Sequence, residues 1–245
     1  MSYTNIIDRY HRRLESYYAA LEKHYESENS LAFLLHQRVV QMEFGLAGWH
    51  FRAGSQVDCE RHLIACLEVA GSNAEIATHW DPDNYDVAEC AGFLSVCLPT
   101  LQVCAFLLDQ KFESCEKLEP YVVFLDGLYH AHLLSNFLVN DVAISFVDAR
   151  KQLVLDQQEG LPEHVCQTLA NYYDLVEFSS EKPIFSNALR AHGRLFDARK
   201  TDDVYSESPL LGGGQYNSQI GDLWCAAILR KLGLGRDYLH AWWSC

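Results

Sequence analysis

Apolar residues recur at three- and four-residue steps through most of the chain, and this spacing predicts helices. The clearest case covers residues 6–25, where isoleucine, leucine and tyrosine form one stripe of an amphipathic helix. A second helix is expected over about residues 30–51, with Ser30 as its cap and a stop at Gly54. Ser55 then opens a third helix, which Gly71 is expected to close.

The rest of the chain shows the same periodicity. After the turn-rich "DPDNYD", residues 87–110 predict a buried helix that is kinked or split before Pro99, because proline removes a backbone donor. The β-prone "YVVFL" lies within a longer pattern that also suits a helix. The last helix covers "NSQIGDLWCAAILRKLG", with Asn217 or Ser218 as its cap and Gly233 as its stop. Further helical patterns lie at 111–118, 120–138, 140–153, 162–177 and 184–199.

These elements predict an all-α fold. Helices of 12–24 residues joined by short polar turns pack naturally as stacked antiparallel pairs, in an irregular bundle or a solenoid-like array. The sequence has no self-similar register at a fixed period, which argues against a regular repeat array. It also has no Pro- or Ser-rich linker, so we expect one domain over residues 1–245.

Charge and cysteine content narrow the class of partner and the compartment. Acidic residues number 33 against 19 basic ones, and the formal net charge is −14. This balance repels nucleic acid and attracts a basic protein at long range. The sequence shows no signal peptide and no apolar run of membrane-spanning length, so no membrane partner is expected. Nine cysteines, an odd number, indicate reduced thiols in a cytoplasmic protein.

Three consecutive glycines at 212–214 suggest a phosphate-binding loop, and the surrounding residues argue against it. The sequence has no Gly-Lys pair, as a Walker loop requires. Asn217 stands where the third glycine of a dinucleotide fingerprint would lie, and "SESPLL" makes a poor preceding strand. The glycines are better interpreted as a permissive turn before the last helix, or as backbone that approaches a protein partner closely.

Candidate metal and nucleophile sites are weak in this sequence. Neither Glu-x-x-His nor Cys-x-x-Cys occurs. Asp126 and His130 are four residues apart on one helical face, with His132 nearby, but a surface or capping histidine pair is the favoured interpretation. Cysteines 90, 97 and 104 recur at seven-residue steps among apolar neighbours, which predicts core packing rather than catalysis. No catalytic residue, metal or cofactor is therefore predicted.

Two acidic stretches are the candidate contact surface. The segment "DPDNYDVAECAG" fails as a calcium loop, because valine stands at position seven and glycine only at position twelve. Each stretch is either a solvated turn or a surface that meets a basic partner. Tryptophans 242 and 243 either cover the core or form an exposed aromatic anchor. The predicted partner-binding residues are Asp81, Asp83, Asp86, Asp202, Asp203, Glu207 and Gly213.

Three helical patterns resemble a family of bacterial immunity proteins. "GSQVDCERHLIACLEVAG" is similar to an early helix of family 49 of the polymorphic-toxin immunity proteins, with its Arg-His-Leu step. "IFSNALRAHGRLFDARK" resembles a later helix of that family, and "DLWCAAILRKLGL" resembles its closing helix. The three patterns occur in the family's order and span most of the chain.

The resemblance implies an all-helical cytoplasmic protein that binds and neutralises a cognate toxin delivered between bacteria. A toxin with a basic surface, such as a nuclease, would suit an acidic inhibitor. A homodimer is left open by the sequence. Two alternatives also stay open: a helical-repeat scaffold that binds another protein or peptide, and a metal-dependent all-helical enzyme that uses Asp126, His130 and His132.

Overall fold

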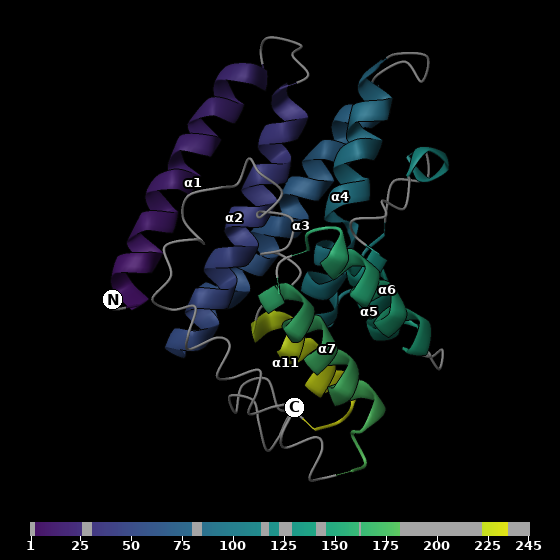
Figure 1. Ribbon diagram of the computed structural model, residues 1–245. Coiled ribbons are helices and arrows are strands. Elements are labelled where there is room, and N and C mark those ends of the chain that lie inside the picture. The colour runs from purple at the N-terminus through teal and green to yellow at the C-terminus, as the bar shows by residue number, and fades with distance from the viewer. Residues whose placement is uncertain are drawn as a thin grey trace. The chain divides into compact units, whose positions relative to one another are not determined.

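A computed structural model describes residues 3–25, 31–79, 85–113, 118–122, 129–140, 146–161, 163–181 and 222–234. Within these ranges the chain is helical and contains no strand, which confirms the all-α prediction (Figure 1). The elements are α1 (Tyr3–Tyr25), α2 (Leu31–Ala53), α3 (Gln56–His79), α4 (Tyr85–Leu107), η1 (Glu119–Tyr121), α5 (Tyr129–Val139), α6 (Val147–Gln158), α7 (Glu163–Glu177) and α11 (Asp222–Lys231).

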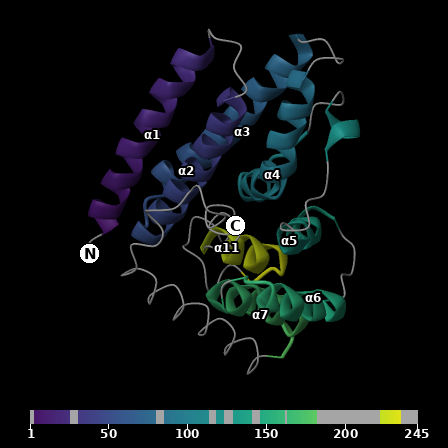
Figure 2. The same ribbon diagram turned by 45° about the horizontal axis from the view of Figure 1, so that its top comes forward.

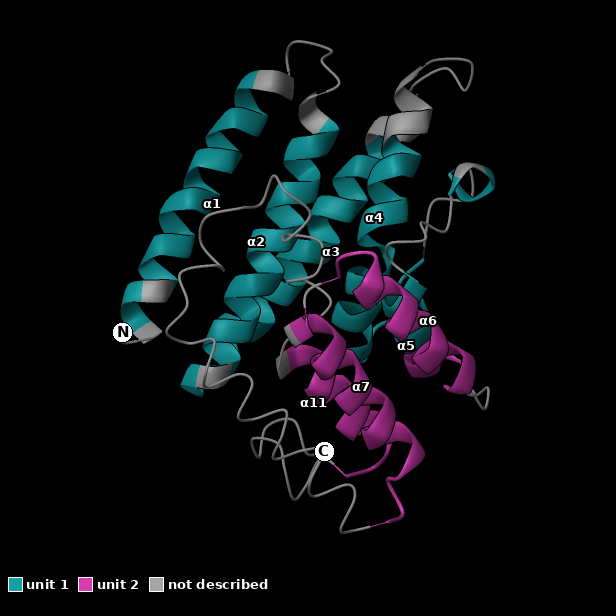
Figure 3. Cartoon of the chain, in the orientation of Figure 1, with its two compact units in different colours: residues 1–135 teal, residues 136–245 magenta. Residues whose placement is uncertain are grey.

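The chain separates into two compact units, residues 1–135 and residues 136–245 (Figure 3). The first unit holds α1 to α4, and the second holds α6, α7 and α11. The expectation of one domain over residues 1–245 stays a prediction.

In the first unit, α1 to α4 lie side by side and run in alternating directions (Figures 1 and 2). Helix α2 is central, because it packs against α1, α3 and α4. Its sequence explains this position: Val40 and Phe44 lie about 100° and about 140° around the helix axis from Val39, and all three are buried. Outer helix α1 instead buries a single stripe that includes Leu14 and Leu21. The predicted antiparallel packing is confirmed for these helices.

A tight turn joins α2 to α3. The Gly54 N–H donates to the Phe51 carbonyl at 3.1 Å, and the Ser55 N–H donates to the His50 carbonyl at 2.9 Å. These two bonds form a Schellman motif, in which Gly54 adopts a φ of 78° that favours glycine. The Ser55 carbonyl then accepts the first bond of α3, from the Cys59 N–H at 3.1 Å. The predicted stop at Gly54 and start at Ser55 are thus confirmed.

Other predicted boundaries were wrong. Helix α3 continues through Gly71 to His79, since a glycine in open space costs a helix little beside the packing of its neighbours. Helix α4 passes Pro99 without splitting, and the alternative of a kink there stays a prediction. Residues 111–113 are not helical, and α6 begins at Val147 rather than at 140. Residues 184–199 and the proposed caps Asn217 and Ser218 lie outside the described residues, whereas the stop at Gly233 is confirmed.

Helix α4 contains the most apolar segment of the described chain. Residues Cys90–Leu107 are long and apolar enough to cross a membrane by length and composition alone. However, 72% of this segment is buried inside the protein, which is the behaviour of a core helix in a soluble protein. Its burial fits packing against α2 and α3.

In the second unit, α7 packs against both α6 and α11. The Arg150 guanidinium on α6 donates to Asp174 Oδ1 at 2.7 Å and to Glu177 Oε2 at 2.9 Å on α7. It also lies 5.7 Å from the centre of the Tyr173 ring, which stacks on Phe146. The unit's core contains the fully buried side chains Tyr172, Tyr173, Leu169 and Trp224.

Candidate functional site

Three histidines from three helices meet inside the first unit: His11 on α1, His50 on α2 and His62 on α3. Each ring offers one nitrogen, and the three nitrogens lie within 4.8 Å of one another. The rings of His50 and His62 stack at a centroid distance of 5.2 Å, and the His11 ring lies 5.4 Å from His62. His50 and His62 are buried, and His11 is half-buried. These residues form the histidine cluster.

Local structure explains why the three rings converge. His50 lies in the last turn of α2 and His62 in the second turn of α3, so the Gly54–Ser55 reversal brings them together. Helix α1 approaches α2 closely beside them, because Gly45 has no side chain where the Tyr10 ring rests. A Cβ at position 45 would lie 2.7 Å from Tyr10 Cε1. This close approach carries the adjacent His11 toward the cluster.

Glu43 supports the cluster from within α2. Its carboxylate accepts a hydrogen bond from the Tyr18 hydroxyl at Oε1, over 2.6 Å, and its Oε2 lies 2.5 Å from His62 Nδ1. Glu43 and His62 are only 3% and 4% exposed, so the pairing satisfies two groups that burial would otherwise penalise. An ionised carboxylate can only accept, so Nδ1 of His62 carries a proton in this contact.

Asp58 plays a comparable part for His50. Asp58 Oδ2 lies 3.7 Å from His50 Nδ1, an ion-pair distance rather than a hydrogen bond. The carboxylate is held by the Ser55 hydroxyl at 2.6 Å and by Arg61 at 3.0 Å. On the other side of the ring, His50 Nε2 is buried and finds no hydrogen-bond partner in the described part of the chain.

Arg61 borders the cluster on its solvent side. Its Nη2 lies 3.4 Å from His62 Nε2, beyond the usual length of an N–H···N hydrogen bond. The side chain of Arg61 is 59% exposed and is anchored by Asp58, so the guanidinium can move into solvent without breaking a buried contact.

Burial sets the protonation of these groups. It lowers the pKa of His11, and the neighbouring His62 and Arg61 lower this pKa further. Burial also lowers the pKa of His50, against an opposing effect of Asp58. The pKa of the Tyr18 hydroxyl is raised by burial and by its bond to Glu43, so it remains a donor. Neutral imidazoles with free lone pairs are the form in which histidine binds metal ions.

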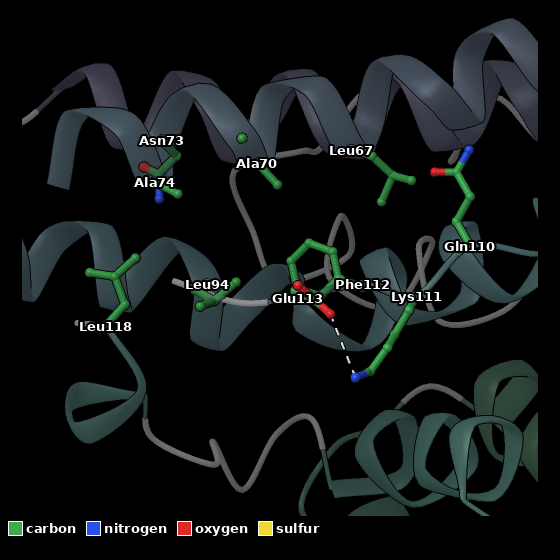
Figure 4. A pocket seen from close by; sticks show the side chains of 11 residues that line it. Leu67, Ala70, Asn73, Ala74, Leu94, Gln110, Lys111, Phe112, Glu113 and Leu118 are labelled. Atoms are coloured by element: carbon green, nitrogen blue, oxygen red, sulfur yellow. Dashed lines mark ion pairs between the residues drawn. The ribbon is translucent and has the colours of Figure 1, made fainter. Parts of the chain in front are cut away.

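A separate cavity of about 300 Å³ lies between α3, α4 and residues 110–113 (Figure 4). Leu67, Ala70 and Leu94 are apolar side chains that line it. Lys111 Nζ lies 3.6 Å from Glu113 Oε1, and both residues also line the cavity. One polar atom is buried there: Asn73 Oδ1 has no hydrogen-bond partner among the described residues. The Asn73 amide does donate to the Cys90 carbonyl, at 3.4 Å.

The predicted contact residues fall on parts of the chain that the structure does not describe. Asp86 lies in the first turn of α4, but its side chain is outside the described residues. The other members of the set also lie outside them, as do the tryptophans at 242 and 243: Asp81, Asp83, Asp202, Asp203, Glu207 and Gly213.

The other candidate residues are partly described. The surface position predicted for His130 and His132 was wrong, because both are buried, at 5% and 6% exposure, and the capping alternative stays a prediction. Asp126 lies outside the described residues. The prediction of core packing for Cys90, Cys97 and Cys104 is confirmed, since all three are buried.

Sequence reasoning missed the histidine cluster. The pair His50 and His62 flanks a predicted turn between two predicted helices, so their proximity was accessible from the helix boundaries alone. His11 gave no such signal, because its position depends on how closely α1 packs against α2. Glu43 gave no signal either, because nothing in the sequence distinguishes it from other glutamates in a helix.

Comparisons with protein-family models, with curated proteins and with solved structures give no match to this chain.

Proposed function

We propose that this protein is an immunity protein that binds a cognate antibacterial toxin in the cytoplasm and neutralises it by stoichiometric binding rather than by catalysis. The observation that carries the proposal is the ordered set of family-like helical patterns. Two of them, residues 54–71 and 222–234, coincide with α3 and α11, which are helices in the structure. The third, residues 184–200, lies outside the described residues.

The charge of the chain supports the same proposal. A formal net charge of −14 steers a basic partner toward the protein and disfavours acidic ones. A nuclease toxin, whose surface must attract nucleic acid, is the class of partner that this charge fits best. The two acidic stretches at 81–86 and 202–207 are the proposed contact surface, with the glycines at 212–214 beside the second.

A helical scaffold that binds another protein or peptide is the second candidate. Helix α6 favours it, because Val147, Val154 and Leu155 are each at least half exposed and lie at helical steps of seven and eight. Apolar side chains grouped on one exposed face are typical of protein–protein contacts. Both candidates therefore predict a binding protein, and they differ in the partner.

Co-expression with candidate toxins tests the proposal, beginning with the product of the adjacent gene. We expect rescue of growth and recovery of a one-to-one complex whose affinity falls as salt is raised. The combined variant Asp81→Lys, Asp83→Lys and Asp86→Lys is expected to weaken the complex and reduce its salt dependence while preserving the helical circular dichroism. If the protein rescues growth from none of the toxins tested and binds none of them, the scaffold is favoured.

Stoichiometry separates binding from catalysis. If the protein acts by binding, protection ends when toxin exceeds inhibitor. Neutralisation of toxin at a small fraction of its concentration would instead indicate an enzyme and would overturn the proposed mode of action.

A further inference from the structure

We propose that His11, His50 and His62 bind a single Zn²⁺ ion that ties α1 to the α2–α3 turn. The proposal goes beyond toxin binding and stands on the geometry of the histidine cluster. Three imidazole nitrogens within 4.8 Å of one another supply the ligand type and number that zinc commonly uses when its fourth position is left to water.

The carboxylates behind the rings carry the argument furthest. Histidines that bind metals usually present their second nitrogen to a carboxylate or carbonyl, which fixes the ring and its tautomer. Here Glu43 Oε2 lies 2.5 Å from His62 Nδ1, and Asp58 Oδ2 lies 3.7 Å from His50 Nδ1. In His62 this leaves Nε2 as the nitrogen available to a metal ion, and in His50 the carboxylate lies on the Nδ1 side of the ring.

The unpartnered atom points to the same conclusion. His50 Nε2 is buried and has no hydrogen-bond partner in the described chain, although burying such an atom without one is costly. An ion bound between the three rings would satisfy this nitrogen. Glu43 itself is held by the Tyr18 hydroxyl, so the support behind His62 is also fixed.

Two adjustments accompany binding. Nitrogens on a tetrahedral zinc ion, with bonds of about 2.0–2.1 Å, are about 3.4 Å apart, so the rings must close by about an ångström. The half-buried His11 ring has the most freedom to do so. Arg61 must also leave His62 Nε2, and its 59% exposed side chain has solvent available to it.

The test uses the full chain, freed of metal with a chelator and titrated with Zn²⁺ and with Co²⁺ as a spectroscopic probe. We expect one tightly bound ion per chain and, with Co²⁺, the visible absorption of a tetrahedral nitrogen–oxygen site. At a hundredfold excess over Kd, Zn²⁺ is expected to raise the Tm by about 5–10 °C.

Variants on one helix supply the matched comparison. His11→Gln is expected to weaken Zn²⁺ binding at least tenfold, about the loss that removal of even an outer-shell partner causes, and to abolish the Tm shift. Arg12→Gln places a glutamine at the adjacent exposed position, and this variant should bind Zn²⁺ as the wild type does. Arg61→Gln removes a competing positive charge and should tighten binding about fivefold.

Several results would overturn the proposal. They are the absence of bound ion in the wild type, equal binding by the His11→Gln and Arg12→Gln variants, or a thiolate-to-cobalt charge-transfer band, which would place the ion on the cysteines. If His11→Gln fails to fold, the Co²⁺ spectrum of the wild type and the response of Arg61→Gln decide the question. Rescue from toxin is a separate readout, so failure of the metal proposal leaves the proposed immunity function untouched.

Discussion

Helix α3 contributes to two buried clusters of opposite character. His62 joins the histidine cluster, where each buried ring is paired with a carboxylate. One turn before and after His62, Cys59 and Cys66 interact with Cys97 and Cys104 of α4, and we call these four residues the cysteine seam. Both clusters consist of groups that can ionise or bind metals, but the two clusters offset the cost of burying such groups in different ways.

Three thiols of the cysteine seam tolerate burial because they are neutral. Burial raises the pKa of Cys59, Cys66 and Cys97, so these thiols carry no charge near neutral pH. The Cys66 thiol donates a weak bond to the Val40 carbonyl at 3.6 Å, and the seam otherwise packs as small apolar groups do. In the histidine cluster, Glu43 instead pairs with His62 and Tyr18, while His50 Nε2 is left without a hydrogen-bond partner among the described residues. Burial is therefore common to both clusters, and the carboxylates beside the buried rings are what distinguish the histidine cluster.

Removal of Glu43 should have the largest effect on this contrast. Glu43→Ala leaves His62 Nδ1 buried without its acceptor and also removes the acceptor of the Tyr18 hydroxyl, so we expect a loss of about 3–5 kcal/mol in the free energy of unfolding. Chemical denaturation in the presence of a chelator measures this loss without any contribution from bound metal. Glu43→Gln keeps the volume and one acceptor oxygen, so it should lose less. An alanine variant as stable as the wild type would show that the pairing contributes nothing.

His36 offers a buried imidazole of a third kind. Its ring contacts are with Phe33 and Phe93, it is 2% exposed, and burial lowers its pKa to about 4. The unfolded chain binds a proton at this residue below about pH 6.5, and the folded chain does so only below about pH 4. Stability contributed by the neutral ring is therefore present above pH 6.5 and is lost as the pH falls between these values.

The expected loss at His36 approaches about 3 kcal/mol by pH 4. Denaturation midpoints measured between pH 7 and pH 4 should fall more steeply for the wild type than for His36→Gln, which cannot take up a proton. Parallel pH profiles for the two proteins would remove His36 as the cause of the acid sensitivity.

A substitution in the cysteine seam should cost less than one at Glu43. Cys66→Ala removes a sulfur from a fully buried position and leaves a small cavity, so a loss of about 1–2 kcal/mol is expected. No charged group loses its partner in this variant. Thermal unfolding compared with Glu43→Ala under the same conditions checks the ranking. A cost at Cys66 equal to that at Glu43 would contradict the distinction between the two clusters.

The contrast also shows what the sequence could predict. Helix type and some starts and stops followed from local chemistry, as at Gly54 and Ser55, where two residues define the turn. The burial of Cys97 and Cys104 followed from seven-residue spacing among apolar neighbours. Both depend on residues close together in the chain, and that information is present in the sequence.

The histidine cluster depends instead on distant residues. His11 is 51 positions from His62, and its approach depends on the fit of Tyr10 against Gly45. Glu43 becomes a supporting group only when α3 lies beside α2. The same reasoning explains the error at His130 and His132, whose polarity suggested a surface position that packing overrides. The predicted contact residues lie outside the described residues and stay a prediction.

The smallest expected effects concern two glycines and test how α1 reaches the histidine cluster. Gly45→Ala gains helix propensity, about 1 kcal/mol, but its Cβ would lie 2.7 Å from the Tyr10 ring. Overpacking costs about 1–3 kcal/mol, so we expect a net loss of about 1 kcal/mol. Gly71→Ala places the same methyl group mid-helix in open space and should stabilise the protein by about 0.5–1 kcal/mol. Thermal melts of both variants measure these opposite changes in stability. Of the two glycines only Gly45 faces α1, so only Gly45→Ala should also weaken Zn²⁺ binding. If both variants gain stability, Tyr10 moves aside freely and the close approach of α1 is not what positions His11.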